Sequence, residues 1–288
     1  MHKDHQQFSC IFCKGSQADV LYEACKDYYL ESPYVVDYYR CGTCGLVQQF
    51  PVPEDIHSLY KEYPSHKPKS KFFSLVRRRL LSSAYYSTNK DASGRVLLDY
   101  GCGDGWFLDT CKNNNYELHG YEPNPAHAQE LSRRLNLEIS SDINALILKH
   151  QGRMDILTMH FVLEHLHNLQ EAFLHASLLI RQGGLFFFTI PNFMSLERKL
   201  FGKKWHNLDP PRHISFPEES VVRALAEEWG FEIVARKFMA FPNGFAASLT
   251  VLLAGRFVPH LFFLMMPIGV LLSRMFPDGV QGYSLIKK

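Results

Sequence analysis

A glycine-rich run, Asp99-Tyr-Gly-Cys-Gly-Asp-Gly105, joins a short apolar stretch to a segment with helical spacing. A strand that turns into a helix through glycines is typical of a doubly wound parallel sheet, where such a turn faces the ligand crevice. Strand-like and helix-like segments continue to alternate from residue 94 to residue 241. We therefore predict an α/β chain with a doubly wound, mostly parallel sheet and helices on both faces.

The alternation also indicates where each element lies. A helix over 168–181 should be capped by Asn168 and stopped by Gly183 and Gly184. The tail at 282–287 could add a last strand to the sheet. We expect strands at 95–99, 116–121, 137–140, 155–159, 184–190 and 231–241, and helices at 105–114, 125–135, 143–150, 168–181 and 217–229.

The residue types around the glycine-rich turn indicate a cationic ligand rather than a dinucleotide. The dinucleotide fingerprint needs a third glycine where Trp106 stands, and the Asp99 carboxylate would repel a pyrophosphate. A sulfonium and an ammonium, as in S-adenosylmethionine, would suit that carboxylate. Glu122, at the end of the second expected strand, could accept hydrogen bonds from ribose hydroxyls. Asp142, after the third strand, could accept one from an adenine amino group.

Two CxxC pairs near the start of the chain indicate a metal site. The pairs are separated by 27 residues, and their thiols suit a tetrahedral zinc ion, so that 1–60 forms a zinc ribbon. Four unconnected thiols are the alternative. With no secretory leader, we expect a cytoplasmic, reducing compartment and free thiols at Cys25, Cys102 and Cys111. The predicted zinc ligands are Cys10, Cys13, Cys41 and Cys44.

The stretch from 94 to 191 resembles a class I S-adenosylmethionine-dependent methyltransferase. The loop at 99–105, Glu122 and the run from Asp155 to His165 match successive motifs of that family. With the cysteine pairs, the chain is also similar to zinc-containing sugar methyltransferases and to methyltransferases associated with surface-polysaccharide synthesis. The resemblance implies a Rossmann-like methyltransferase fold and a cofactor site lined by Asp99, Gly101, Cys102, Gly103, Gly105, Glu122, Asp142 and His160.

Methyl transfer is an in-line displacement, so the protein mainly aligns the acceptor atom, the methyl group and the sulfur. A hydroxyl acceptor also needs a general base, and histidine is suited to this near neutral pH. The candidates are His165, His206 and His213, the last of which follows the rigid Asp209-Pro-Pro-Arg212 run. Each of them could instead be a hydrogen-bonding scaffold.

The resemblance places His160, Glu164 and His165 at the border of the acceptor pocket, and Glu164 is a further catalytic candidate. Quinone-biosynthesis O-methyltransferases of similar sequence carry ExxEH, in which two acids and a histidine hold a divalent metal. Phe161 replaces the first acid here, so we expect no catalytic metal and give a quinone or catechol acceptor less weight. Trp205 could stack on a sugar face or belong to the core.

Residues 238–276 contain two charged side chains, Arg256 and Arg274. Each uncharged run is shorter than the ~20 apolar residues that a membrane-spanning helix needs. We predict an apolar helical hairpin over 242–279 that lies on one leaflet; a dimer interface and a buried hairpin are the alternatives. A linker and basic helix are expected at 61–93. Because six of the thirteen residues 67–79 are Lys or Arg, this segment could meet anionic lipid, or simply be solvated.

Lysine and arginine number 31 against 29 acids, and this formal charge of +2 argues against a nucleic-acid coat. The methyltransferase domain should comprise 94–241 and 280–288. The leading hypothesis is methyl transfer to a saccharide or lipid-linked saccharide at the inner membrane face. The alternatives are an RNA methyltransferase with a zinc-ribbon recognition module and a non-catalytic cofactor-binding scaffold. The acceptor, the methylated atom and the oligomeric state stay open.

Overall fold

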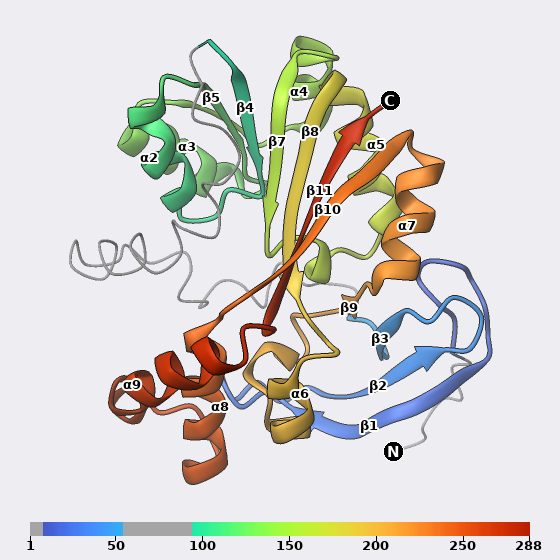
Figure 1. Ribbon diagram of the computed structural model, residues 1–288, viewed down its shortest axis with the longest axis vertical. Helices are drawn as coiled ribbons and strands as arrows, with labels where there is room; N and C mark the ends of the chain where they lie inside the picture. Colours follow the sequence, from blue (N-terminus) through green and yellow to red (C-terminus); the bar gives the residue numbers. More distant parts are fainter. Residues whose placement is uncertain (1–7, 54–93) are drawn as a thin grey trace.

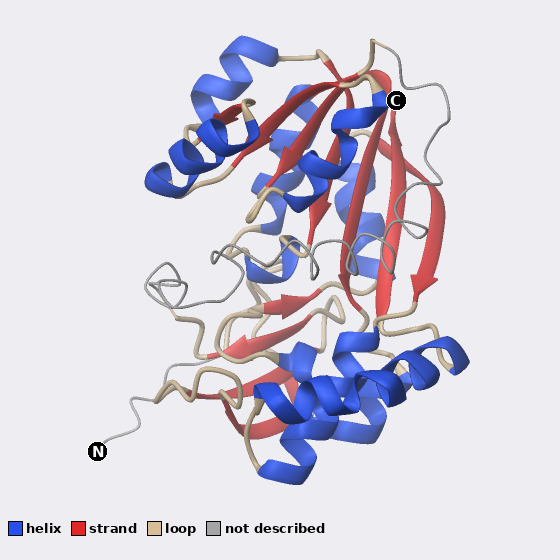
Figure 2. Ribbon diagram, turned by 90° about the vertical axis from the view of Figure 1, so that its left-hand side faces the viewer, coloured by secondary structure: helices blue, strands red, loops and turns tan. Residues whose placement is uncertain are grey.

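The computed structural model describes residues 8–53 and 94–288, and a seven-stranded sheet is its largest element (Figures 1 and 2). Its strands run parallel except β11, which is antiparallel to both neighbours. The expected α/β class and mostly parallel sheet are confirmed. The strands in spatial order are β10 (Phe231–Met239), β11 (Val280–Lys287), β8 (Ile180–Pro191), β7 (Met154–His160), β4 (Val96–Tyr100), β5 (Glu117–Tyr121) and β6 (Glu138–Ser140).

Helices cover both faces of this sheet because its central strands carry apolar side chains on both sides. Leu97 and Ile156 pack on one face with α2 and α3, and Leu98 and Leu157 pack on the other with α4, α5 and α7. Figure 1 shows α2 and α3 together to one side of the strands, away from α5 and α7. The helices are α2 (Trp106–Cys111), α3 (Pro125–Leu135), α4 (Ile143–His150), α5 (Leu169–Leu179) and α7 (Glu219–Glu228).

A second, antiparallel sheet is built from the N-terminal segment and one distant strand. Its order is β1-β2-β3-β9, with β1 (Ala18–Lys26), β2 (Val35–Cys41), β3 (Val47–Phe50) and β9 (Ser215–Phe216). Beyond this short pairing, the Gln49 backbone N–H donates to the carbonyl oxygen of Ile214 at 2.8 Å. The N-terminal sheet is therefore completed by residues that lie far along the chain.

Most of the segment 192–216 is buried, and it packs into the core of the N-terminal sheet. Trp205 is 2% exposed and packs in one cluster with Phe193 and Phe216, so the core alternative for Trp205 holds. This segment contains α6 (Leu196–Phe201) and two short 3-10 turns, η5 (Gly202–Lys204) and η6 (His206–Leu208). The connection after β8 thus supplies part of the core of the N-terminal sheet.

The expected apolar hairpin is present as α8 (Pro242–Ala254) and α9 (Pro259–Met275), placed between β10 and β11. Figure 2 shows both helices below the large sheet, with little else on their outer side. In the described part of the chain, no helix is long and apolar enough to cross a membrane. The outer side chains include Leu252, Leu253, Phe263, Leu264, Ile268, Leu271 and Met275, which are between 45% and 68% exposed.

Several element boundaries differ from our expectation. The helix after Asn168 ends at Leu179, and β8 starts directly at Ile180, so Gly183 adopts its φ of 70° inside the strand rather than ending the helix. The C-terminal tail does form the predicted last strand, β11, which lies between β8 and β10. The expected linker and basic helix at 61–93 lie outside the described residues, and the division into domains stays a prediction.

Candidate functional site

The glycine-rich loop between β4 and α2 has the backbone conformation that its sequence requires. Gly101, Gly103 and Gly105 have φ values of 72°, 51° and 69°, a region that residues with a Cβ rarely adopt. The backbone N–H groups of Gly101 and Cys102 donate to the carbonyl oxygen of Tyr121 at 2.8 and 3.0 Å. The loop is therefore held against the carboxyl end of β5, where a ligand crevice is expected in such sheets.

A buried carboxylate ends the strand that leads into this loop. Asp99 is 2% exposed, and the Thr158 hydroxyl donates to its Oδ1 at 2.8 Å. Burial, with the nearby Asp104 as a further cause, raises the pKa of Asp99 to about 7. No lysine or arginine within 8–53 or 94–288 forms an ion pair with Asp99. A ligand cation beside it would stabilise the ionised form.

The other predicted cofactor residues surround the same end of the sheet. Glu122 follows β5, is 5% exposed and accepts the Asn124 N–H at 3.1 Å. Asp142 is exposed after β6 and caps α4 by accepting two backbone N–H groups. His160 ends β7 with its ring 4.4 Å from that of Phe107. The Cys102 side chain is 5% exposed, and its Sγ would lie 3.2 Å from a Cβ built at Gly120 in β5.

These residues fit S-adenosylmethionine by the chemistry of the set. Asp99 and Glu122 are buried acids at the carboxyl ends of neighbouring strands, suited to a cation and to ribose hydroxyls. A Cβ built at Gly103 meets nothing within 4 Å, so open space lies above the loop. These acids and this space would hold the cofactor and orient its sulfonium, which supplies the methyl group.

A second cluster combines Glu164 and His165, which follow β7, with His213 from the loop after η6. Their ligating atoms lie within 4.8 Å of one another, and the two imidazole rings are 4.6 Å apart. The Nδ1 of His165 lies 3.0 Å from the Arg212 carbonyl, and that of His213 lies 2.6 Å from the Asn207 carbonyl. Because a carbonyl only accepts, both Nδ1 atoms carry hydrogen, and each neutral ring has its lone pair on Nε2.

Burial controls the protonation of this cluster. Burial raises the pKa of Glu164 to about 8. The Glu164 carboxylate accepts no hydrogen bond from the described residues. Burial lowers the pKa of His165 to about 3, with His213 as the next cause, and also lowers the pKa of His213. At neutral pH the cluster therefore consists of two neutral imidazoles and a mostly protonated carboxyl group.

Our expectation of no catalytic metal rested on Glu164 and His165 being two ligands alone. His213 supplies a third group of the right type, so counting ligands no longer excludes a metal. The expectation therefore stays a prediction.

The sequence comparison decides the family. Residues 69–236, more than half of the chain, match the family described as "Methyltransferase domain". This protein belongs to the methyltransferases. The activity that follows is methyl transfer from S-adenosylmethionine, while the sugar-associated subtype is not part of that match.

Solved structures of methyltransferases share the fold at low sequence identity. An S-adenosylmethionine-dependent methyltransferase from Archaeoglobus fulgidus is 17% identical, with a TM-score of 0.52 over 81% of this chain and 100% of that one. A chain in a Haloferax volcanii complex that contains the Trm112 methyltransferase activator is 11% identical, with a TM-score of 0.55 over 82% of this chain and 99% of that one. Haemonchus contortus phosphoethanolamine N-methyltransferase 2 is 11% identical, with a TM-score of 0.51 over 84% of this chain and 62% of that one. A search among curated proteins found no significant match.

The methyltransferase also contains a buried charge network that our sequence reasoning missed. Arg212 is fully buried, and its guanidinium donates to both oxygens of Asp27 at 2.7 and 2.8 Å and to Asp209. Arg212 holds the pKa values of both acids below their usual range, against the opposing effect of burial. The Asp209-Pro-Pro-Arg212 run was a signal, since it places an acid and an arginine three residues apart, and the two pair with each other as well as with Asp27.

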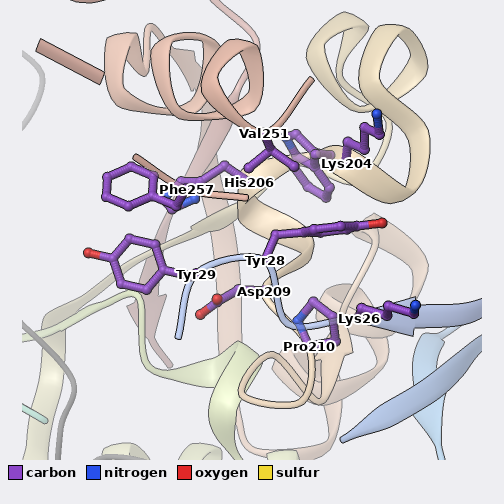
Figure 3. A pocket seen from close by; sticks show the side chains of 10 residues that line it. Lys26, Tyr28, Tyr29, Lys204, His206, Asp209, Pro210, Val251 and Phe257 are labelled. Carbon is purple, nitrogen blue, oxygen red and sulfur yellow. The ribbon is translucent and has the colours of Figure 1, made fainter. Parts of the chain in front are cut away.

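A pocket lies where this network meets the hairpin, and it is lined mainly by aromatic and charged side chains (Figure 3). The ring centroids of Tyr29 and Phe257 are 4.6 Å apart on one side of the pocket, while Lys26 and Lys204 lie on the other side. His206 belongs to this pocket, and burial lowers its pKa to about 4. The full lining is Lys26, Tyr28, Tyr29, Lys204, Trp205, His206, Asp209, Pro210, Val251 and Phe257.

The four paired cysteines come together as predicted. The Sγ atoms of Cys10 and Cys44 are 3.6 Å apart and those of Cys13 and Cys41 are 3.5 Å apart. Tetrahedral Zn–S bonds of ~2.3 Å give S···S separations of about 3.8 Å. The cluster could therefore hold a zinc ion, while Cys25, Cys102 and Cys111 are free thiols.

Proposed function

We propose that this methyltransferase methylates a hydroxyl of a lipid-linked saccharide. One observation carries the proposal: a small hollow (Figure 3), too small to enclose a sugar, brings polar residues beside the buried Arg212 network together with two residues of the apolar hairpin, Val251 and Phe257, so an acceptor would bind across its mouth. Aromatic faces and lysines suit a sugar or a sugar phosphate. The exposed apolar side of α8 and α9 suits the lipid part of the same molecule.

In the proposed reaction, the acceptor oxygen forms a bond to the methyl carbon while the sulfur–methyl bond breaks, which leaves S-adenosylhomocysteine. The acceptor proton moves to Nε2 of His165, the more exposed of the two neighbouring rings, whose lowered pKa keeps it unprotonated before the acceptor binds. The Arg212 carbonyl holds Nδ1 and so aims Nε2. His213 then has a positioning role, because its ring packs edge-on against that of His165 at 4.6 Å. A carbon acceptor would need the same alignment.

The experiment uses methyl-labelled S-adenosylmethionine with two acceptor pools, solvent-extracted lipid-linked saccharides and total RNA. We expect label in the first pool and a loss of at least tenfold in kcat for His165→Gln, with unchanged affinity for S-adenosylmethionine. Label in RNA would support the zinc-ribbon recognition alternative. Binding of S-adenosylmethionine without transfer to either pool would support the scaffold alternative. Either result contradicts the proposal.

We also propose that Cys10, Cys13, Cys41 and Cys44 hold one structural zinc ion. Their S···S separations and the burial of Cys10 and Cys41 support it. Zinc analysis of purified protein should lose one equivalent per chain in Cys13→Ser but not in Cys25→Ser. Equal zinc content in the two variants would contradict the assignment.

A further inference from the structure

A cluster of two histidines and a glutamate lies at the β5–β6 edge of the large sheet, near the start of β6. His119 lies in β5, Glu138 begins β6 as its register partner, and His150 ends α4. Because neighbouring partners in a sheet point to the same face, both side chains point toward α4. His119 and His150 are 6% and 2% exposed, and their ring centroids are 4.5 Å apart.

The ring nitrogens of these histidines are incompletely satisfied. His119 Nε2 is 3.0 Å from Glu117 Oε1, a hydrogen bond that leaves the lone pair of a neutral ring on Nδ1. The Nδ1 of His119 and both ring nitrogens of His150 make no hydrogen bond to the described residues. Buried polar atoms without partners are uncommon in proteins and call for an explanation.

We propose that His119, Glu138 and His150 bind a divalent transition-metal cation, of which Zn²⁺ is the representative. Glu138 Oε2 is 3.4 Å from His119 Nδ1 and 4.0 Å from His150 Nε2. Tetrahedral ligands at 2.0–2.1 Å from zinc stand about 3.4 Å apart, so a small shift of Glu138 closes the site. Imidazole with one carboxylate favours zinc-like ions over magnesium or calcium.

The surrounding charges support the same assignment. Glu117 accepts the other N–H of His119, the arrangement that commonly orients a metal-bound imidazole. Lys149 pairs with Oε1 of Glu138, which leaves Oε2 for the ion. Glu138 is 44% exposed, so the ion has an entry path and a place for a water ligand.

The ion would join three elements that are otherwise held weakly. β6 is a three-residue edge strand, and the ion would tie its first residue to β5 and to the end of α4. The opposite end of α4 begins at Asp142, the predicted adenine contact. The metal site would thus steady the helix that presents this cofactor residue.

The test counts zinc after dialysis against micromolar Zn²⁺ and removal of free metal. We expect two equivalents per chain in the parent protein, one in His150→Asn and one in Glu138→Gln. The control His260→Asn changes an exposed histidine on α9 and should keep two. Cys13→Ser should lose one equivalent but keep the one at His150, which separates this site from the cysteine cluster.

A parent protein that holds no more zinc than Glu138→Gln overturns the proposal. In that case His119 lies between Glu117 and Glu138 without a metal, and the cluster is a polar network of the protein alone. Glu138→Gln keeps the test decisive if His150→Asn does not fold, because Glu138 is half exposed. A zinc-dependent rise in melting temperature that His150→Asn lacks is the second supporting readout.

Discussion

Single glycines decide how close a ligand can come to the first loop of the large sheet. Gly103 and Gly152 share a left-handed backbone, with φ of 51° and 64°, and neither would place a Cβ within 4 Å of another atom. They differ in their surroundings, since Gly103 lies in the cofactor loop and Gly152 in the turn after α4. An alanine therefore meets the same backbone strain at both positions but occupies ligand space at only one.

We predict that Gly103→Ala lowers the affinity for S-adenosylmethionine by at least tenfold, whereas Gly152→Ala does not change it. Both substitutions should cost about 1–2 kcal/mol of stability, because alanine disfavours the left-handed region. Calorimetric titration with S-adenosylmethionine and urea unfolding measure the two quantities. Equal affinity in the two variants would show that the space above Gly103 is not ligand space.

Elements far apart in sequence are joined through one buried arginine. Arg212 links the turn after β1, through Asp27, to the turn after η6, through Asp209. Removing one partner from a buried ion pair leaves uncompensated charge in the core. The N-terminal sheet and the methyltransferase sheet are therefore expected to unfold together.

Arg212→Ala should lower the free energy of unfolding by about 3–5 kcal/mol, since Asp27 and Asp209 would stay buried without their partner. Arg223→Ala, which removes a 57% exposed partner of Glu219, should cost roughly 1 kcal/mol or less. Urea unfolding, followed by tryptophan fluorescence, measures the free energy of unfolding of both variants. Similar losses for both variants would contradict the assigned role of the network.

The outer side chains of the α8–α9 hairpin are apolar, and neither helix is long and apolar enough to cross a membrane. We expect the protein to float with vesicles that contain anionic lipid. The double substitution Leu264→Glu with Leu271→Glu should abolish flotation, while Leu148→Glu, at an exposed leucine on α4, should not. Flotation that survives the double substitution would assign the hairpin to a protein partner instead.

At the scale of the whole molecule, buried titratable groups set how stability depends on pH. Glu197 is fully buried against Gly244 and Gly279. Burial, and also Asp278, raise its pKa to about 8. Between the ordinary glutamate pKa and pH 8 the folded state holds a proton that the unfolded state has lost. The contribution of Glu197 is therefore complete at low pH and is lost as pH rises through about 8.

Glu197→Gln keeps the shape of the side chain but cannot ionise. We predict that the variant loses less stability than the parent between pH 5 and pH 9, by an amount on the order of a few kcal/mol. Melting curves across this range provide the measurement. Parallel curves for the two proteins would mean that folding does not raise the pKa of Glu197.

The sheet was predictable because each strand and helix carries its own local pattern. The glycine loop, Asp99 and Glu122 were predictable for the same reason, since each follows directly on a strand. The proximity of His213 to Glu164 was not, because no local pattern records a contact between loops that lie 49 positions apart. The two-residue strand β9 was also too short to leave a periodic signal.

The strand β9 has a consequence for how the chain is made. Protein domains usually fold from the N-terminus as they leave the ribosome. Here the sheet that is synthesised first keeps an open edge at β3, and Asp27 lacks its arginine, until residues 212–216 have emerged. The earliest part of the chain is therefore finished only after most of the cofactor domain has been translated, and during that interval its bare strand edge is a site where nascent chains could pair with one another.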